Sequence, residues 1–329
     1  MEGYSIHKLN RKNFNILIPL MKDCFGMNVD LSYFEWKYLD NPAGFVEGYY
    51  AICNKNNEVA AYYGGIAQNY FINGKSIKVI QSCDTMTHSM HRRKGLFQML
   101  VKHCDNELAL RNELFIIGFG GSKTAPGYLK YGWKKLFKVK NYFLLPIFIH
   151  LFYRINKQFS LQINKDLIGI EHLLELNSKK ISKKNKYYIN RSFDFYNWRI
   201  KNPLHTYKVA KLKHEDHEQI SSYIIYYTEE NKIILFDFYF HSITEGQSLI
   251  KSIYNHERAF VNIKGVTFFC QNNSIWRSQL LRLNFISNPL NIGPLSEKMF
   301  FVINSNFKDD ISPINPNSWS VNSFDHDCL

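Results

Sequence analysis

Residues 82–99 carry the side chains whose types and spacing best suit chemistry. A strand-like run ends near Thr87, a basic loop of sequence His-Arg-Arg-Lys-Gly follows at residues 91–95, and an amphipathic helical pattern begins at Leu96. The first turn of a helix has backbone N–H groups without helical partners, and the helix dipole adds partial positive charge there. Gly95 lets the backbone approach a ligand without a Cβ in the way. The segment therefore predicts a cradle for a diphosphate.

A tyrosine follows this loop in a context that also suits catalysis. Residues 114–119 form a continuous apolar run, which predicts a buried strand, and a short helix is expected at residues 125–131. That helix carries Tyr128, which thus follows the loop and the buried strand in the chain.

The elements before this segment must hold it in place. Residues 14–25 and 33–39 have the spacing of helices, and Pro42 disfavours helical backbone just before it, so the second helix ends there. Polar turns then separate three strands of an antiparallel meander at residues 48–53, 59–69 and 76–87. This order of helices and strands predicts an α/β layer architecture.

Residues 92–97 resemble the diphosphate loop of the GNAT acyltransferase family, Q/R-x-x-G-x-G/A. Arg92 and Gly95 match its first and fourth positions, whereas Phe97 stands where the family has a small residue. The residues from Tyr128 to Trp133 are similar to the family's Y-x-x-x-G-F, with tryptophan in place of phenylalanine. The resemblance covers residues 1–145. It implies the GNAT fold, a mixed and mostly antiparallel central sheet flanked by helices, with acyl-CoA (acetyl-CoA or a short hydroxyacyl-CoA) as co-substrate.

The resemblance also implies roles for individual residues. The implied cofactor-binding residues are Met86, Thr87, Arg92, Arg93, Lys94, Gly95, Leu96, Phe97 and Ser122. Tyr128 is the implied general acid for the leaving thiolate. Asp84 and His88 are the candidates for the base that takes the amine proton, and a structural role for Asp84 fits the sequence equally well. A covalent acyl-enzyme is disfavoured, because the sequence has no G-x-S-x-G elbow.

The second half of the chain echoes the first without repeating the loop. Trp36-Lys37 and Trp198-Arg199 each precede an Asn-Pro pair, which predicts a duplicated domain. We expect a GNAT domain that binds acyl-CoA at residues 1–150, a connecting segment at 151–189, and a degenerate GNAT-like substrate-binding domain at 190–329. The connecting segment contains a dense lysine run, which is typical of a solvated linker or loop: Lys179, Lys180, Lys183, Lys184 and Lys186.

The expected substrate-binding residues lie mainly in this second half. A strand at residues 233–241 would place Asp237, Tyr239 and His241 on one face, where they suit either a polar pocket or the exposed face of an edge sheet. Trp36 and Trp198 offer surfaces on which a base could stack. The closing segment, which begins at Trp319 and ends in Asp-His-Asp, is similar to that of bacterial GNAT-like proteins that acylate nucleotide-linked amino sugars in surface-polysaccharide biosynthesis.

The resemblance therefore implies transfer of an acyl group to the amine of a nucleotide-linked amino sugar, such as a dTDP-3-amino-3,6-dideoxyhexose. An aminoglycoside, a polyamine or a peptide is the alternative acceptor, and an acyl-CoA-binding sensor without turnover is the alternative class. The net charge of +13 permits an anionic partner, but no nucleic-acid-binding motif is present, so we expect small-molecule substrates and no nucleic acid.

The remaining features of the chain suggest a cytoplasmic protein. The N-terminus lacks the apolar core of a signal peptide. The most apolar stretch, at residues 143–152, is far shorter than the ~20 residues of a membrane helix. The six cysteines match no zinc-binding spacing, so we expect free thiols and no metal.

Overall fold

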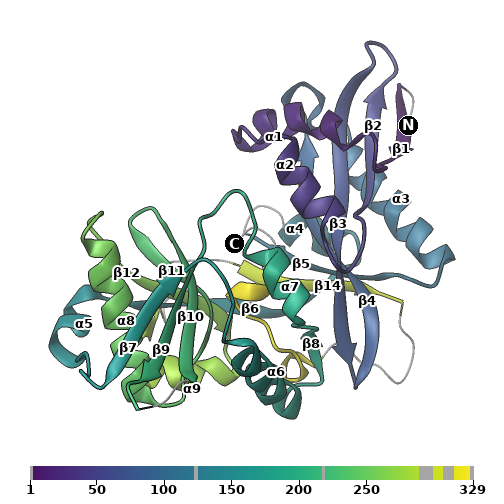
Figure 1. Cartoon of the computed structure of the whole chain (residues 1–329). Coiled ribbons are helices and arrows are strands. Elements are labelled where there is room, and N and C mark those ends of the chain that lie inside the picture. Colours follow the sequence, from purple (N-terminus) through teal and green to yellow (C-terminus); the bar gives the residue numbers. More distant parts are fainter. Residues whose placement is uncertain (1–2, 122–124, 217–218, 289–298, 307–314, 327–329) are drawn as a thin grey trace. The chain divides into compact units, whose positions relative to one another are not determined.

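The computed structural model describes residues 3–121, 125–216, 219–288, 299–306 and 315–326 (Figure 1). The chain divides into two compact units. The first comprises Met1–Phe137, Lys201–Leu204 and Phe300–Asn315, and the second comprises Lys138–Ile200, His205–Met299 and Pro316–Leu329. The boundary near residue 137 precedes the expected one at 150, because most of strand β6 (Lys134–Leu144) pairs with a strand of the second unit.

The sheet of the first unit is mostly antiparallel. Its strands pair in the order β1-β2-β3-β4-β5-β14, and only β4 and β5 run parallel. These strands are β1 (Tyr4–Lys8), β2 (Glu47–Cys53), β3 (Glu58–Ile72), β4 (Lys75–Thr87), β5 (Phe115–Gly120) and β14 (Met299–Ser305). The expected meander and buried strand are therefore present.

Helices flank this sheet at the predicted residues 14–25, 33–39, 96–110 and 125–131, and one further short helix precedes Arg92. They are η1 (Phe14–Leu17), α1 (Ile18–Phe25), α2 (Leu31–Phe34), η2 (Glu35–Leu39), η3 (Ser89–His91), α3 (Leu96–Leu110) and α4 (Ala125–Lys130). The apolar face of α3 includes Leu100, Cys104 and Leu108, at helical spacing, and it packs against β2, β3 and β4. This packing fixes the start of α3 beside the end of β4.

The second unit repeats the same order of elements. Its strands pair in the order β6-β12-β11-β10-β9-β7, with β11 and β12 parallel, and β13 (Ile286–Ser287) pairs with β6. The other bounds are β7 (Phe159–Asn164), β9 (Lys208–His214), β10 (Ile220–Glu229), β11 (Lys232–Tyr239) and β12 (Gly265–Gln271). In both units an antiparallel hairpin leads through a helix to a parallel strand. The duplicated architecture is therefore confirmed.

The helices of the second unit include the segment expected to be a connector. They are α5 (Pro146–Phe152), α6 (Glu171–Lys184), α7 (Phe193–Arg199), α8 (Ile243–Arg258) and α9 (Ile275–Arg282), and short segments are β8 (Tyr187–Ile189), η4 (Pro316–Ser318) and η5 (Ser323–Asp325). Most of the lysine run lies on α6, not in a loop as expected. Leu173, Leu174 and Ile181 bury one face of α6, and lysines near a helix C-terminus interact favourably with its dipole.

The five described cysteines are free thiols, and Cys328 lies outside the described residues. Among the described helices, none combines the length and the apolar character that a membrane crossing requires.

Candidate active site and substrate pocket

The loop between β4 and α3 leaves the first turn of α3 without a side-chain cap. Arg93 and Gly95 adopt left-handed conformations, with φ of 62° and 77°. Gly95 is the N-cap of α3 and has no side chain to accept from the first-turn N–H groups. Arg92, Arg93 and Lys94 are exposed around it, whereas the Leu96 side chain is buried, so only the backbone of Leu96 can contact a ligand. Ser122, the other expected cofactor contact, lies outside the described residues.

Strands β4 and β5 are paired over only part of their length. Their ladder runs from Ile80↔Ile116 to Ser82↔Gly118, and β4 continues to Thr87. The β3–β4 register shifts just here, and Asp84 takes a left-handed φ of 50°, as in a β-bulge. The end of β4, which includes Met86 and Thr87, therefore extends beyond its parallel partner.

Tyr128 reaches the point where this pairing ends. Its hydroxyl lies 3.0 Å from Oγ of Ser82, the last β4 residue in the ladder. Its buried ring lies 4.5 Å from the Trp133 ring and 6.0 Å from the Phe97 ring, between centroids. A Cβ at Gly127 would come within 3.3 Å of the Phe97 ring. The glycine thus leaves room for the large residue that departs from the family's loop pattern.

The two candidate bases differ in their surroundings. Asp84 accepts from Lys37 Nζ through Oδ1 and from the Tyr38 hydroxyl through Oδ2, both at 2.8 Å, inside the first unit. Burial, and next the Asp84 carboxylate, raise the pKa of Tyr38 well above its ordinary range, which keeps Tyr38 a donor. These contacts favour a structural role for Asp84. His88 follows β4 and its side chain is 21% exposed, so it remains accessible.

Comparison with known proteins decides the family of this site. Residues 5–136 match a family whose description is an acetyltransferase (GNAT) domain. Residues 5–136 are a GNAT domain. No curated protein matches the chain in sequence. The matched range contains the loop, the ladder end and Tyr128, and an acetyltransferase domain makes the chain an N-acyltransferase.

Solved structures share the fold across both units. A GCN5-related N-acetyltransferase from Anabaena variabilis has a TM-score of 0.64 and 15% identity, over 91% of this chain and 72% of that one. A tandem GNAT protein from the clavulanic acid pathway has a TM-score of 0.62 and 10% identity, over 93% and 100%. Saccharomyces cerevisiae N-myristoyltransferase with myristoyl-CoA has a TM-score of 0.61 and 12% identity, over 94% and 80%. At these identities the likeness concerns the fold.

The corresponding helix start of the second GNAT-like unit differs from that of the GNAT domain. Only Phe240, His241 and Ser242 connect β11 to α8. Ser242 is the N-cap of α8, and its hydroxyl accepts from the Glu245 N–H at 3.2 Å. The first turn of α8 is therefore capped by its own side chain, where Gly95 leaves the first turn of α3 uncapped.

The C-terminal segment fills the corresponding end of the parallel ladder in the second unit. The β11–β12 ladder ends at Ile234↔Thr267, and β6 occupies the other edge of β12. Beyond this end, Phe269 N donates to Ser323 Oγ at 3.0 Å and Gln271 N donates to the Val321 carbonyl at 3.1 Å. The edge of β12 that faces β11 is thus occupied by residues 321–323.

Three of the residues expected to contact substrate are buried in the interior of the protein. Asp237 is buried, and its carboxylate accepts from Arg191 at 3.2 Å and from Tyr196 and Tyr223 at 2.7 Å. The alternation of residues along β11 predicts correctly which face of the strand carries Asp237, but α6 and α7 cover that face at Asp237. Trp36 and Trp198 are also buried, at 5% and 4% exposure. The structure therefore offers no exposed ring for stacking at either tryptophan.

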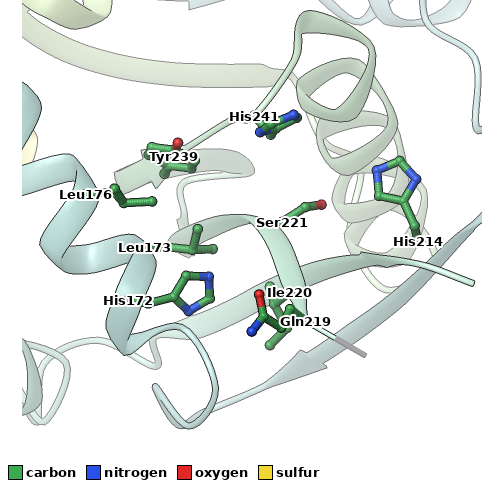
Figure 2. A pocket seen from close by; sticks show the side chains of 9 residues that line it. All are labelled: His172, Leu173, Leu176, His214, Gln219, Ile220, Ser221, Tyr239 and His241. Atoms are coloured by element: carbon green, nitrogen blue, oxygen red, sulfur yellow. The ribbon is translucent and has the colours of Figure 1, made fainter. Parts of the chain in front are cut away.

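Tyr239 and His241 do line a pocket, of about 480 Å³, in the second unit (Figure 2). Its other members are not predicted from the sequence. They come from α6 and from the facing ends of β9 and β10: His172, Leu173, Leu176, His214, Gln219, Ile220 and Ser221. None of the nine described lining residues is Asp or Glu. Glu245 is buried beneath these lining residues. Its Oε2 accepts from the Ser221 hydroxyl at 2.6 Å, and its Oε1 lies 3.2 Å from His214 Nε2.

Proposed function

We propose that the chain transfers a short acyl group from acyl-CoA to the amino group of a nucleotide-linked amino sugar. The GNAT domain would hold acyl-CoA, with the diphosphate at the uncapped start of α3 and the pantetheine amides against the free end of β4. The observation that carries the proposal is the contact of Tyr128 with Ser82 where the β4–β5 ladder ends.

The proposed reaction is direct. The neutral amine nitrogen attacks the thioester carbonyl carbon, and backbone N–H groups stabilise the oxyanion. The C–S bond then breaks, and the Tyr128 hydroxyl gives its proton to the departing thiolate. Ser82, as a hydrogen-bond partner, orients that hydroxyl. A base or a water relay takes the excess amine proton, and His88 is better placed for this role than Asp84, since Asp84 is engaged by Lys37 and Tyr38.

The acceptor class rests on the pocket of the second unit. Imidazoles of His172, His214 and His241 line it together with hydroxyl and amide groups, and Lys180 Nζ lies 3.9 Å from the Tyr239 ring centroid. A cationic acceptor such as a polyamine or aminoglycoside needs carboxylates, which the described lining residues do not supply. A lining of this kind favours an acceptor with phosphate groups, and the net charge of +13 acts in the same direction.

Thiol release from acetyl-CoA and short hydroxyacyl-CoAs tests the proposal. The expected result is release that depends on a nucleotide-linked amino sugar and disappears with the free amino sugar. Faster turnover of polyamines, aminoglycosides or peptides than of every nucleotide sugar would overturn the acceptor and leave the acyltransferase standing. Stoichiometric acyl-CoA binding without release for any amine would instead indicate a sensor.

A further inference from the structure

Glu58, His88 and His91 bring three metal-binding groups together just before the diphosphate loop. One ligand atom from each lies within 4.8 Å of the others. Glu58 opens β3, His88 follows β4 and His91 ends η3, so three separate segments meet here. The His91 side chain is 7% exposed, whereas those of His88 and Glu58 are 21% and 39% exposed, which leaves one side of the cluster open to a solvent-borne ion.

The spacing of these atoms suits a tetrahedral ion. His91 Nε2 lies 3.0 Å from Glu58 Oε2, and His88 Nε2 lies 3.5 Å from Glu58 Oε1. Around zinc, with bonds of ~2.0–2.2 Å, two tetrahedral ligand atoms lie roughly 3.4 Å apart. Because one ligand atom from each residue lies within 4.8 Å of the others, side-chain movements that bring these atoms about 3.4 Å apart would complete three corners of such a site.

A hydrogen bond to a residue outside the three ligands orients the buried imidazole of His91. The Tyr4 hydroxyl lies 2.9 Å from His91 Nδ1. When Nδ1–H donates to the tyrosine oxygen, Nε2 keeps its lone pair and points at the cluster, as in metal sites where the second ring nitrogen of a ligating histidine is hydrogen-bonded. His88 Nδ1 accepts from the Met90 N–H at a long 3.3 Å, and binding through Nε2 requires that this contact be released.

We propose that Glu58, His88 and His91 form a binding site for a zinc-like divalent ion, with its fourth position open to water. The ion would tie the start of β3 to the end of β4 and to η3, directly before Arg92. It would thus hold the entry to the diphosphate loop, in a structural role. With the ion bound at Nε2, His88 would not serve as the base, and the amine proton would leave through the water relay. Cysteine spacing alone predicts no metal, whereas Glu58 is far in the chain from His88 and His91 and comes near them only when β3 and β4 pair.

The test uses the full chain without a histidine tag, after removal of metals with a chelator. Calorimetry with Zn²⁺ should show one saturable site per chain, and Co²⁺ should give the visible absorption of a tetrahedral site. Glu58→Gln and His88→Gln should each weaken binding at least tenfold. Tyr4→Phe should weaken it by about 10–100-fold without changing the stoichiometry, because it removes only a supporting hydrogen bond.

His256→Gln is the matched control. His256 Nε2 lies 3.9 Å from Glu257 Oε1, so it pairs with a carboxylate but belongs to no three-ligand group among the described residues. This variant should bind zinc like the unaltered chain. Zinc should also raise the Tm of the unaltered chain but not the Tm of Glu58→Gln. We expect this variant to fold, because the Glu58 side chain is partly exposed. Absence of saturable binding, or equal affinity in Glu58→Gln and His256→Gln, would overturn the site.

Discussion

The Tyr128 hydroxyl lies 3.0 Å from Ser82 Oγ, and this contact joins α4 to the last residue of β4 that pairs with β5. The sequence alone places Tyr128 on a helix after a buried strand. The fold adds that its hydroxyl is held where β4 continues without β5. In the proposed reaction the proton donor for the thiolate must be held in a fixed position, and this contact would supply one.

Tyr128→Phe should lower kcat by at least about tenfold, since general acid catalysis typically contributes ~10²–10⁴-fold. Acyl-CoA affinity should change little, because the ring and its packing on Trp133 remain. Steady-state kinetics beside calorimetry would measure both. Tyr131→Phe is the control, because Tyr131 lies near the same Phe97 ring. If Tyr128→Phe leaves kcat unchanged while chemistry is rate-limiting, Tyr128 has no part in proton transfer.

Gly95→Val should abolish acyl-CoA binding in a folded protein. A branched side chain would crowd the first turn of α3 and would also resist the left-handed φ of 77°. Gly74→Val is a matched control, because Gly74 has φ of 79° and open space around its Cβ position in the β3–β4 turn. Both changes should lower the Tm, but only the first should remove the calorimetric signal for acyl-CoA. An equal loss in both would point to unfolding.

Asp84→Asn should destabilise the first unit by about 3–5 kcal/mol, because it leaves the Lys37 ammonium buried without its counter-ion. Asp237→Asn should do the same in the second unit, where Arg191 would lose one of its two carboxylates. Chemical denaturation would measure both, with exposed Asp40→Asn as control. A variant Asp84→Asn of unchanged stability and much lower kcat would instead identify Asp84 as the base.

Asp105 should make stability fall as the pH rises from about 4 to about 7. Burial raises the pKa of this carboxyl from 3.8 to about 7, opposed by its hydrogen bond from Asn304. In this range the folded state holds more protons than the unfolded state, so the free energy of unfolding decreases with increasing pH. Asp105→Asn should remove this slope and be the more stable protein at pH 8. If denaturant titrations give the same pH dependence of the free energy of unfolding for Asp105→Asn and the unaltered chain, the raised pKa of Asp105 is contradicted.

Local signals account for what the sequence predicts well. The spacing of Leu96, Leu100 and Cys104 gives the bounds of α3, and the glycine before it identifies the loop. The meander and the buried strand follow from alternation, turn residues and an apolar run. Each of these depends on residues close together in the chain, so sequence reasoning recovers them.

Long-range packing accounts for what the sequence does not predict. The alternation of residues along β11 suits a pocket position for Asp237. In the structure Arg191, Tyr196 and Tyr223 enclose its carboxylate, and the residues near Asp237 in the sequence do not predict these contacts. The pocket itself joins α6 to the ends of β9, β10 and β11, so His172 and His214 were not recognisable as its members. The sequence of the lysine run is typical of a linker, because its many charged residues make the apolar positions of α6 difficult to recognise.

We propose that the chain holds one acyl-CoA, in the GNAT domain. The second unit has a capped helix start and an occupied β12 edge, so it should hold none. Native mass spectrometry with acetyl-CoA counts the bound molecules directly. The account predicts one acetyl-CoA per chain, and none in folded Gly95→Val. Two per chain, or one that persists in Gly95→Val, would contradict it.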